Sequence, residues 1–209
     1  FDIFCSNAII ESGNQVVAII SMPQNARPNN SPDISLYAKK HNIPYHEFED
    51  INSIDSLKLL RNYAPDYIIS SWPKIIKQDV INITKYHIVG THPSNLPFNR
   101  GRHPLHWLIV SGIQETKLSF FRMDEGIDTG NILLQIPFTI STDDTINDAN
   151  DKMNLAAYRG TRELCKKFQL DPSYPGEKQN HKLANYWRKR TPHDVTLDLR
   201  MPADLIIKI

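Results

Sequence analysis

Short apolar runs that alternate with helical patterns constrain the fold of this 209-residue chain more than any other feature. Residues 1–10 carry apolar side chains at helical spacing, Gly13 is a suitable C-cap, and the β-branched run 15–20 follows. Continuous runs of this kind are typical of parallel strands covered on both faces. Further strands are expected at 43–46, 65–71 and 86–89, and further helices at 34–41, 53–62 and 77–83. The pattern predicts an α/β fold in which a mostly parallel, twisted sheet carries helices on both faces.

Proline, asparagine and glycine mark the boundaries between these elements. Residues 22–33 are rich in proline and asparagine and are expected to form a loop, with Ser31 or Asp33 as the N-cap of the next helix. Pro104, at a first helical position, and Gly112, just past the last one, bracket another helix.

The rest of the chain predicts a hairpin, a long helix and a polar tail. Two apolar runs within 117–140 indicate a hairpin whose long loop holds Asp128, and residues 146–168 carry a long helical pattern. From Asp171 the chain becomes rich in proline, lysine and asparagine. A chain of this length buries one good core, so we expect one domain over residues 1–170 and an extension over 171–209 that packs on it or leaves it.

Charge and hydropathy narrow the classes of partner. With 24 basic and 23 acidic residues the formal net charge is +1. The chain therefore lacks the general excess of positive charge that is typical of nucleic-acid-binding proteins. The basic run 188–190 is either a phosphate contact or a solvated surface segment. No apolar run approaches the ~20 residues that a membrane span needs, so we expect a cytoplasmic protein. Cys5 and Cys165 cannot build a disulfide framework, and both are expected to be reduced packing residues.

An imidazole and a carboxylate stand where an α/β fold places catalytic groups. His92 follows a short apolar run directly and lies in a Pro-rich loop, and Asp128 lies in a Gly-punctuated turn. Ligands of α/β sheets bind at the carboxyl ends of the strands, where His92 is expected. An imidazole near neutral pKa accepts a proton, and a nearby carboxylate orients the ring. The two residues therefore predict a proton-transfer site.

Two other ligand classes find little support. His103 and His106 form an HxxH pattern, but a zinc site needs a third and a fourth ligand, and none is evident, so we expect no metal. Neither the dinucleotide-binding glycine pattern nor a phosphate-binding P-loop occurs.

The segments HPSNLPFNRG (92–101) and MDEGIDTGNILLQ (123–135) resemble the signature loops of the tetrahydrofolate-dependent formyltransferases. The similarity runs through nearly the whole chain and is weakest between residues 23 and 55. The resemblance implies a Rossmann-like formyltransferase fold, a catalytic domain over 1–170, and a first strand that would lie before Phe1. It also implies N10-formyltetrahydrofolate as the formyl donor, with His92 and Asp128 as two of three catalytic side chains.

Further site residues follow from the same resemblance. One set matches the segment and the loop that border the folate pocket, although the first of these is also compatible with ordinary core: Trp72, Pro73, Lys74, Ile76, Glu125, Gly126 and Ile127. A second set is placed to meet substrate hydroxyls or phosphate: Ser94, Arg100 and Arg102. Alternatively, Arg100 pairs with a carboxylate and holds the loop.

The third catalytic position departs from the family pattern. The family places an asparagine two residues before the histidine, where its amide binds the formyl oxygen, and this chain has Gly90 there. Either another donor has taken over, such as Thr91, Asn95, Asn99, a backbone N–H or an ordered water, or the protein is an altered member. We expect the first, because losing one oxyanion donor costs roughly 10²–10³ in rate and does not abolish chemistry.

The acceptor is expected to be an amino sugar. The stretch 91–109 looks most like the sugar N-formyltransferase branch, whose members act on nucleotide-linked amino sugars destined for surface glycans or nonulosonic acids. Loop 22–33 has one arginine and one aspartate, too little charge to meet tRNA phosphates, so methionyl-tRNA formyltransferase is the alternative. A folate- or sugar-binding module without catalysis is the alternative of another class. Expected partners are thus a small amino sugar and neither nucleic acid nor membrane, and a homodimer is left open.

Overall fold

The computed structural model describes residues 1–27 and 33–206 of the chain. Its longer helices are α1 (Asp2–Glu11), α3 (Ile54–Tyr63), α5 (Pro104–Val110) and α6 (Ile146–Leu170). Its short helices are α2 (Ser35–Lys40), α4 (Gln78–Ile81) and α7 (Ala203–Ile206), with 3₁₀ turns at His181–Leu183 and Pro192–Val195. Its strands are β1 (Ile19–Ser21), β2 (Tyr45–Glu47), β3 (Tyr67–Ser70), β4 (His87–His92), β5 (Arg100–Gly101), β6 (Glu115–Arg122), β7 (Ile132–Thr139) and β8 (Tyr186–Trp187).

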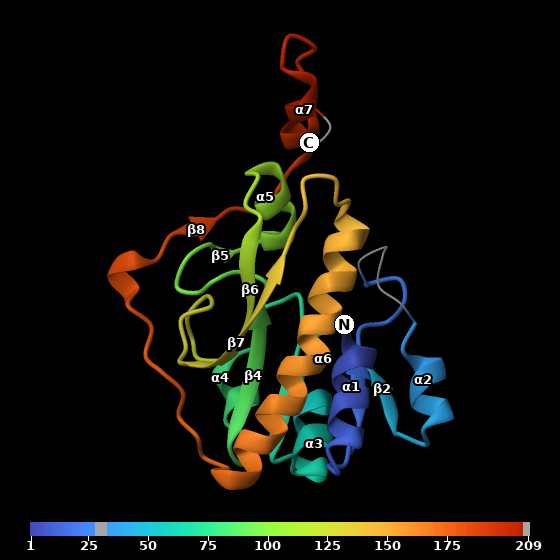
Figure 1. Cartoon of the computed structure of the whole chain (residues 1–209). Coiled ribbons are helices and arrows are strands. Elements are labelled where there is room, and N and C mark those ends of the chain that lie inside the picture. Colours follow the sequence, from blue (N-terminus) through green and yellow to red (C-terminus); the bar gives the residue numbers. More distant parts are fainter. Residues whose placement is uncertain (28–32, 207–209) are drawn as a thin grey trace.

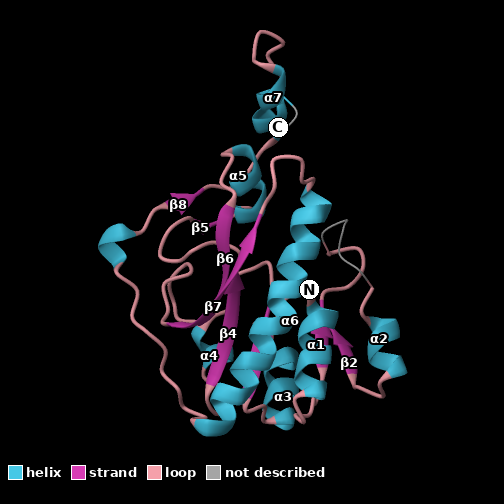
Figure 2. Ribbon diagram, viewed as in Figure 1, coloured by secondary structure: helices cyan, strands magenta, loops and turns pink. Residues whose placement is uncertain are grey.

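The strands form one central sheet and two small parallel pairs (Figures 1 and 2). The central sheet has the order β3-β4-β6-β7, in which β3 and β4 are parallel and the remaining pairs are antiparallel. Strands β1 and β2 form one parallel pair, and β5 and β8 form another. The α/β prediction is confirmed, and the predicted hairpin is β6 and β7, which adds an antiparallel half to the parallel one.

Helix α6 covers one face of the hairpin and lies beside α1 (Figure 1). Thr145 and Asp148 start it with a capping box, in which each side chain bonds the other's backbone. Its buried face, which includes Leu164, shares the main apolar cluster with Leu118 and Phe120 of β6. A Cβ on Gly160 would collide with the ring of Phe120, so α6 approaches the sheet more closely than any larger residue allows.

The space between β1 and β3 is a cavity of about 620 Å³ that α1 also lines. The hydroxyl of Ser71, just past β3, donates to Asp2 Oδ1 at 2.7 Å, which holds the start of α1 at the carboxyl end of that space. Both bordering strands are parallel to their other neighbours.

Several local expectations can be compared with the structure. The N-cap of α2 is Ile34, so the expectation for Asp33 was wrong by one residue, although the Asp33 carboxylate accepts the N–H of Ser35. Ser31 lies outside the described residues. Cys5 is buried, and burial raises the pKa of its thiol to about 12, but Cys165 is only half-buried. None of the helices within residues 1–27 and 33–206 combines the length and apolar character that a membrane span requires.

The segment after α6 returns along the edge of the sheet. Glu177 pairs with Ile132 at the start of β7, and β8 pairs with β5. In Figure 1 the chain then runs past α5 to α7, which lies away from the sheet. The part of the extension between residues 174 and 187 thus packs on the core.

We predict that Gly160→Ala destabilises the protein by about 1–3 kcal/mol, because the new methyl group overpacks the contact with Phe120. Intrinsic helix propensity favours alanine by about 1 kcal/mol, so a net loss in urea denaturation isolates the packing effect. Asp151→Ala, on the exposed side of the same helix, is the control. A stabilised Gly160→Ala variant would contradict the close packing.

Candidate active site

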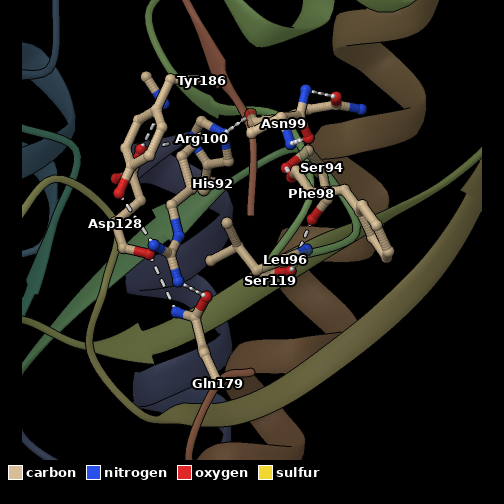
Figure 3. A network of polar contacts seen from close by, with 12 residues as sticks. His92, Ser94, Leu96, Phe98, Asn99, Arg100, Ser119, Asp128, Gln179 and Tyr186 are labelled. Atoms are coloured by element: carbon tan, nitrogen blue, oxygen red, sulfur yellow. Dashed lines mark hydrogen bonds and ion pairs between the residues drawn. The ribbon is translucent and has the colours of Figure 1, made fainter. Parts of the chain in front are cut away.

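His92 is the last residue of β4, in the middle of the sheet, and the residue is 4% exposed. Its Nε2 lies 2.7 Å from the carbonyl oxygen of Asn99 (Figure 3). A carbonyl can only accept, so Nε2 carries a proton. The other ring nitrogen, Nδ1, faces Asp128 Oδ2 at 3.5 Å. The two predicted residues lie together, and one imidazole nitrogen remains to take or give a proton.

Asp128 is held in an uncommon backbone conformation. Its φ is 54°, in the left-handed region that residues other than glycine rarely adopt. Its Oδ2 accepts the backbone N–H of Gly101 at 2.8 Å, and its backbone carbonyl accepts Gln179 Nε2 at 2.9 Å. These hydrogen bonds therefore hold the carboxylate in place next to His92. Backbone strain of this kind is often found at functional sites.

The loop that follows His92 is pinned by the hairpin. Ser119, which faces His92 across the β4–β6 pairing, donates its hydroxyl to Ser94 O at 2.6 Å. Gln135 of β7 donates to that hydroxyl and to the carbonyl of Leu96. Ser94 in turn donates to Phe98 O. These bonds fix the path of the loop up to Asn99, whose carbonyl sets the proton on His92.

A buried arginine and a glutamine fix the Asp128 loop from behind. Arg100 is 1% exposed, and its guanidinium donates to Gln179 Oε1 at 2.7 Å and to the Tyr186 hydroxyl at 2.9 Å. Gln179 Nε2 then donates to the carbonyls of Asp128 and Gly130. Sequence reasoning missed Gln179, because its partners lie at least 49 residues away along the chain and no local pattern points to them.

The predicted substrate contacts separate into two groups. Ser94 and Arg100 are buried and bonded within the protein, which argues against direct contact with a substrate. The alternative for Arg100 needs a correction, since it holds the loop through the amide of Gln179 and not through a carboxylate. Arg102 is exposed beside the site.

The position of the family asparagine is filled by another side chain. A Cβ on Gly90 would lie 2.6 Å from Cζ of Phe121, the residue of β6 that is paired with Gly90. Side chains alternate along a strand, so Thr91 faces the opposite side of the sheet from His92, which argues against Thr91 as the substitute donor. The Asn99 amide oxygen accepts a hydrogen bond from Asn185.

The residues predicted to border the folate pocket converge from two segments. Trp72 and Ile76 pack in the same apolar cluster as Met123, at the start of the Asp128 loop. Lys74 donates to Glu49 O, which tethers its loop. A cavity of about 510 Å³ is lined by Met123 and Glu125, but by none of Trp72, Lys74, Ile76, His92 and Asp128. It reaches Tyr86 and His87 at the amino end of β4, whereas His92 lies at the carboxyl end of that strand.

The remaining predicted residues of that set lie at the surface or in the turn. Ile127 is 58% exposed, and the N–H of Gly126 is bonded to Asp124. Pro73 lies in the exposed segment between Trp72 and Lys74. Within the described part of the chain, no three His, Cys, Asp or Glu side chains gather closely enough to hold a metal ion.

The chain belongs to the formyl transferase family, because the family model described as "Formyl transferase" matches residues 6–163. A methionyl-tRNA formyltransferase of Pelotomaculum thermopropionicum is 32% identical over 168 residues, which cover 78% of this chain and 53% of that relative. The chain thus spans about half the length of this curated relative.

Solved structures share the fold. Methionyl-tRNA formyltransferase from Clostridium thermocellum matches with a TM-score of 0.65 at 22% identity, covering 91% of this chain and 80% of that one. The formyltransferase PseJ from Anoxybacillus kamchatkensis was solved in complex with UDP-4,6-dideoxy-4-formamido-L-AltNAc and tetrahydrofolate. It matches with a TM-score of 0.60 at 23% identity, and the match covers 76% of this chain and 82% of that one. The predicted family is confirmed, but the sugar branch is not, since the curated relative above is a methionyl-tRNA formyltransferase.

We predict that Gly90→Ala destabilises the protein by about 1–3 kcal/mol, because the methyl group collides with the ring of Phe121. Phe121→Leu removes that ring edge, so the double variant should lose less than the sum of the two single losses in urea denaturation. Additive losses would show that Phe121 does not occupy the position next to Gly90.

We predict that Gln179→Leu lowers stability by about 1–3 kcal/mol, because it leaves the carbonyls of Asp128 and Gly130 and the Arg100 guanidinium without this partner. Proteolysis should also become faster at the loosened 124–130 loop. Lys178→Ala, at the exposed neighbouring position, controls for the segment itself. Equal melting temperatures and equal rates of cleavage for Gln179→Leu and Lys178→Ala would show that Gln179 does not hold the Asp128 loop in place.

Proposed function

We propose that the protein transfers a formyl group from N10-formyltetrahydrofolate to a primary amine, with His92 and Asp128 as the catalytic pair. One observation carries the proposal: Nε2 of the buried His92 is hydrogen-bonded to Asn99 O, and Nδ1 of the same ring faces Asp128 Oδ2 at 3.5 Å. This arrangement leaves one nitrogen, beside a carboxylate, for proton transfer.

The reaction needs removal of a proton from the attacking amine, stabilisation of charge on the formyl oxygen, and protonation of the departing nitrogen. Nδ1 of His92 accepts the amine proton, and the imidazolium that forms is stabilised by Asp128 and by the Asn99 carbonyl. The same nitrogen returns the proton to the departing nitrogen. The bound donor supplies the activated formyl carbon.

The residues around the site fit a reduced folate. Trp72, Ile76 and Met123 pack in one apolar cluster, and Glu125 follows Met123 by two residues, so apolar and polar groups lie together as a flat heteroaromatic ring with polar edges requires. We place the donor between the segment 72–76 and the loop 125–127. Asn52 bonds both Ile75 O and Lys77 N, which holds the first of these segments in place.

We propose that the acceptor is an amino sugar, nucleotide-linked and used for surface glycan or nonulosonic acid synthesis. The only arginine of loop 22–33 is Arg27, and it forms ion pairs with Asp33 and Glu47. That loop therefore offers little positive charge to RNA. The fold is shared with PseJ, whose solved structure holds a nucleotide-linked sugar that already carries the formyl group, so this fold accommodates a nucleotide-linked sugar.

Methionyl-tRNA is the second candidate acceptor, and the name of the curated relative favours it. The test is to incubate the protein with N10-formyltetrahydrofolate and either a panel of amino-sugar nucleotides or methionyl-tRNA, and to detect the formylated product by mass. Formylation of a sugar nucleotide supports the proposal, and formylation of methionyl-tRNA alone replaces the acceptor. Donor binding without turnover on either would indicate a binding module.

We predict that His92→Ala and Asp128→Asn each lower kcat/KM for formyl transfer by at least ~10²-fold, because each removes part of one proton-transfer unit. The double variant should be little worse than the worse single one. Asp143→Asn, an exposed carboxylate before α6, is the control. Losses that multiply in the double variant would mean that the two residues act independently.

A further inference from the structure

Basic residues from two distant parts of the chain meet beside the candidate active site. The β5–β8 pairing brings them together: Arg102 N donates to Trp187 O at 3.0 Å, and Trp107 Nε1 donates to Arg188 O at 2.8 Å. We call the resulting group the basic cluster. Its members are Arg102, His103, His106, Lys189 and Arg190.

Two cations of the basic cluster, Arg102 and Lys189, are not paired with any carboxylate of the described residues. The carboxylate of Asp194 is paired with Arg188. Both Arg102 and Lys189 are exposed. Arg190 stacks on Trp107, with Cζ 5.5 Å from the ring centre, which orders this part of the surface.

The pKa values of both histidines of the basic cluster are lowered, first by burial and then by neighbouring positive charge. Burial, followed by the charges of the neighbouring cations, lowers the pKa of His103. Burial, followed by His103 and Arg190, lowers the pKa of His106. Both rings are therefore neutral near pH 7 and can donate or accept a hydrogen bond. Like charges gathered on one surface attract an anion, and arginine suits phosphate because it bonds two oxygens at once.

The basic cluster begins next to the proton-transfer pair. Gly101 donates its N–H to Asp128 Oδ2 at 2.8 Å, and Arg102 is the next residue, about 3.8 Å further along the Cα trace. A molecule that presents an amine to His92 can therefore extend over the basic cluster. This placement suits an acceptor that carries its amine on a sugar and its negative charge on phosphates attached to that sugar.

We propose that Arg102, His103 and Lys189 form the subsite for the diphosphate of a nucleoside-diphosphate-linked amino sugar. This inference rests on the proposed formyl transfer, and it assigns a specificity role to residues outside the proton-transfer pair. Arg102 and Lys189 bind the phosphate oxygens, and the neutral imidazole of His103 donates a hydrogen bond. The basic run 188–190 then contributes through Lys189 to acceptor binding.

The direct test is calorimetric titration of the full chain with uridine diphosphate and with inorganic diphosphate at low salt. Wild type should bind both, and Arg102→Ala/Lys189→Ala should weaken both by at least ~10-fold, since two phosphate contacts are lost. Lys40→Ala/Lys58→Ala removes the same charge from exposed positions on α2 and α3 and should bind as wild type does. Equal melting temperatures of the variants exclude misfolding.

Two binding results overturn the subsite. One is the absence of binding to wild type at millimolar ligand, and the other is an equal affinity of wild type and Arg102→Ala/Lys189→Ala. A short RNA hairpin serves as a third ligand. If the hairpin depends on Arg102 and Lys189 while neither diphosphate binds, the surface recognises RNA and the sugar-nucleotide assignment is wrong.

Turnover separates this inference from the proposed function. In Arg102→Ala/Lys189→Ala the KM for an amino-sugar nucleotide should rise by about 10-fold or more while kcat stays within about two-fold, because ground-state binding is lost and the proton-transfer pair is intact. Turnover with an unchanged KM overturns the subsite and leaves formyl transfer standing. Diphosphate binding that requires Arg102 and Lys189, without formylation of any amino-sugar nucleotide, supports the subsite and overturns the proposed reaction.

Discussion

The antiparallel pairing of β6 with β4 is the contact on which the candidate site depends. It sets Ser119 opposite His92, so one hydroxyl can bind the loop that follows the histidine. It also brings the chain from β6 into the loop that carries Asp128, so the carboxylate reaches the histidine at the end of β4. A shift of one residue would turn the side chains of β6 to the other face and separate these partners.

A second layer of contacts comes from the segment after α6. Gln179 bonds two carbonyls of the Asp128 loop, and Asn185 bonds both the N–H and the side chain of Asn99. Asn99 in turn supplies the carbonyl that fixes the proton on His92. The extension is therefore part of the support of the site, and the residues up to 170 do not hold the geometry alone.

Gly90 and Phe121 show how a departure from the family pattern is accommodated. A side chain at position 90 would point toward the same face as His92, and the Phe121 ring now fills that space. The apolar ring cannot donate a hydrogen bond to a formyl oxygen. If formyl transfer occurs, the charge on that oxygen must be stabilised from another direction than in relatives with the asparagine.

The amino-acid sequence by itself determined the α/β class, the hairpin, the long helix and the family, because these depend on local periodicity and on two continuous motifs. It also singled out His92 and Asp128, which the structure brings to 3.5 Å of each other. Only the tertiary structure decided that Ser94 and Arg100 are buried supports, that Gln179 clamps the loop, and that Arg102 shares a surface with Lys189. Each of these roles depends on pairing between strands and segments that are far apart in the chain, such as β5 with β8. Local sequence patterns do not indicate such pairings.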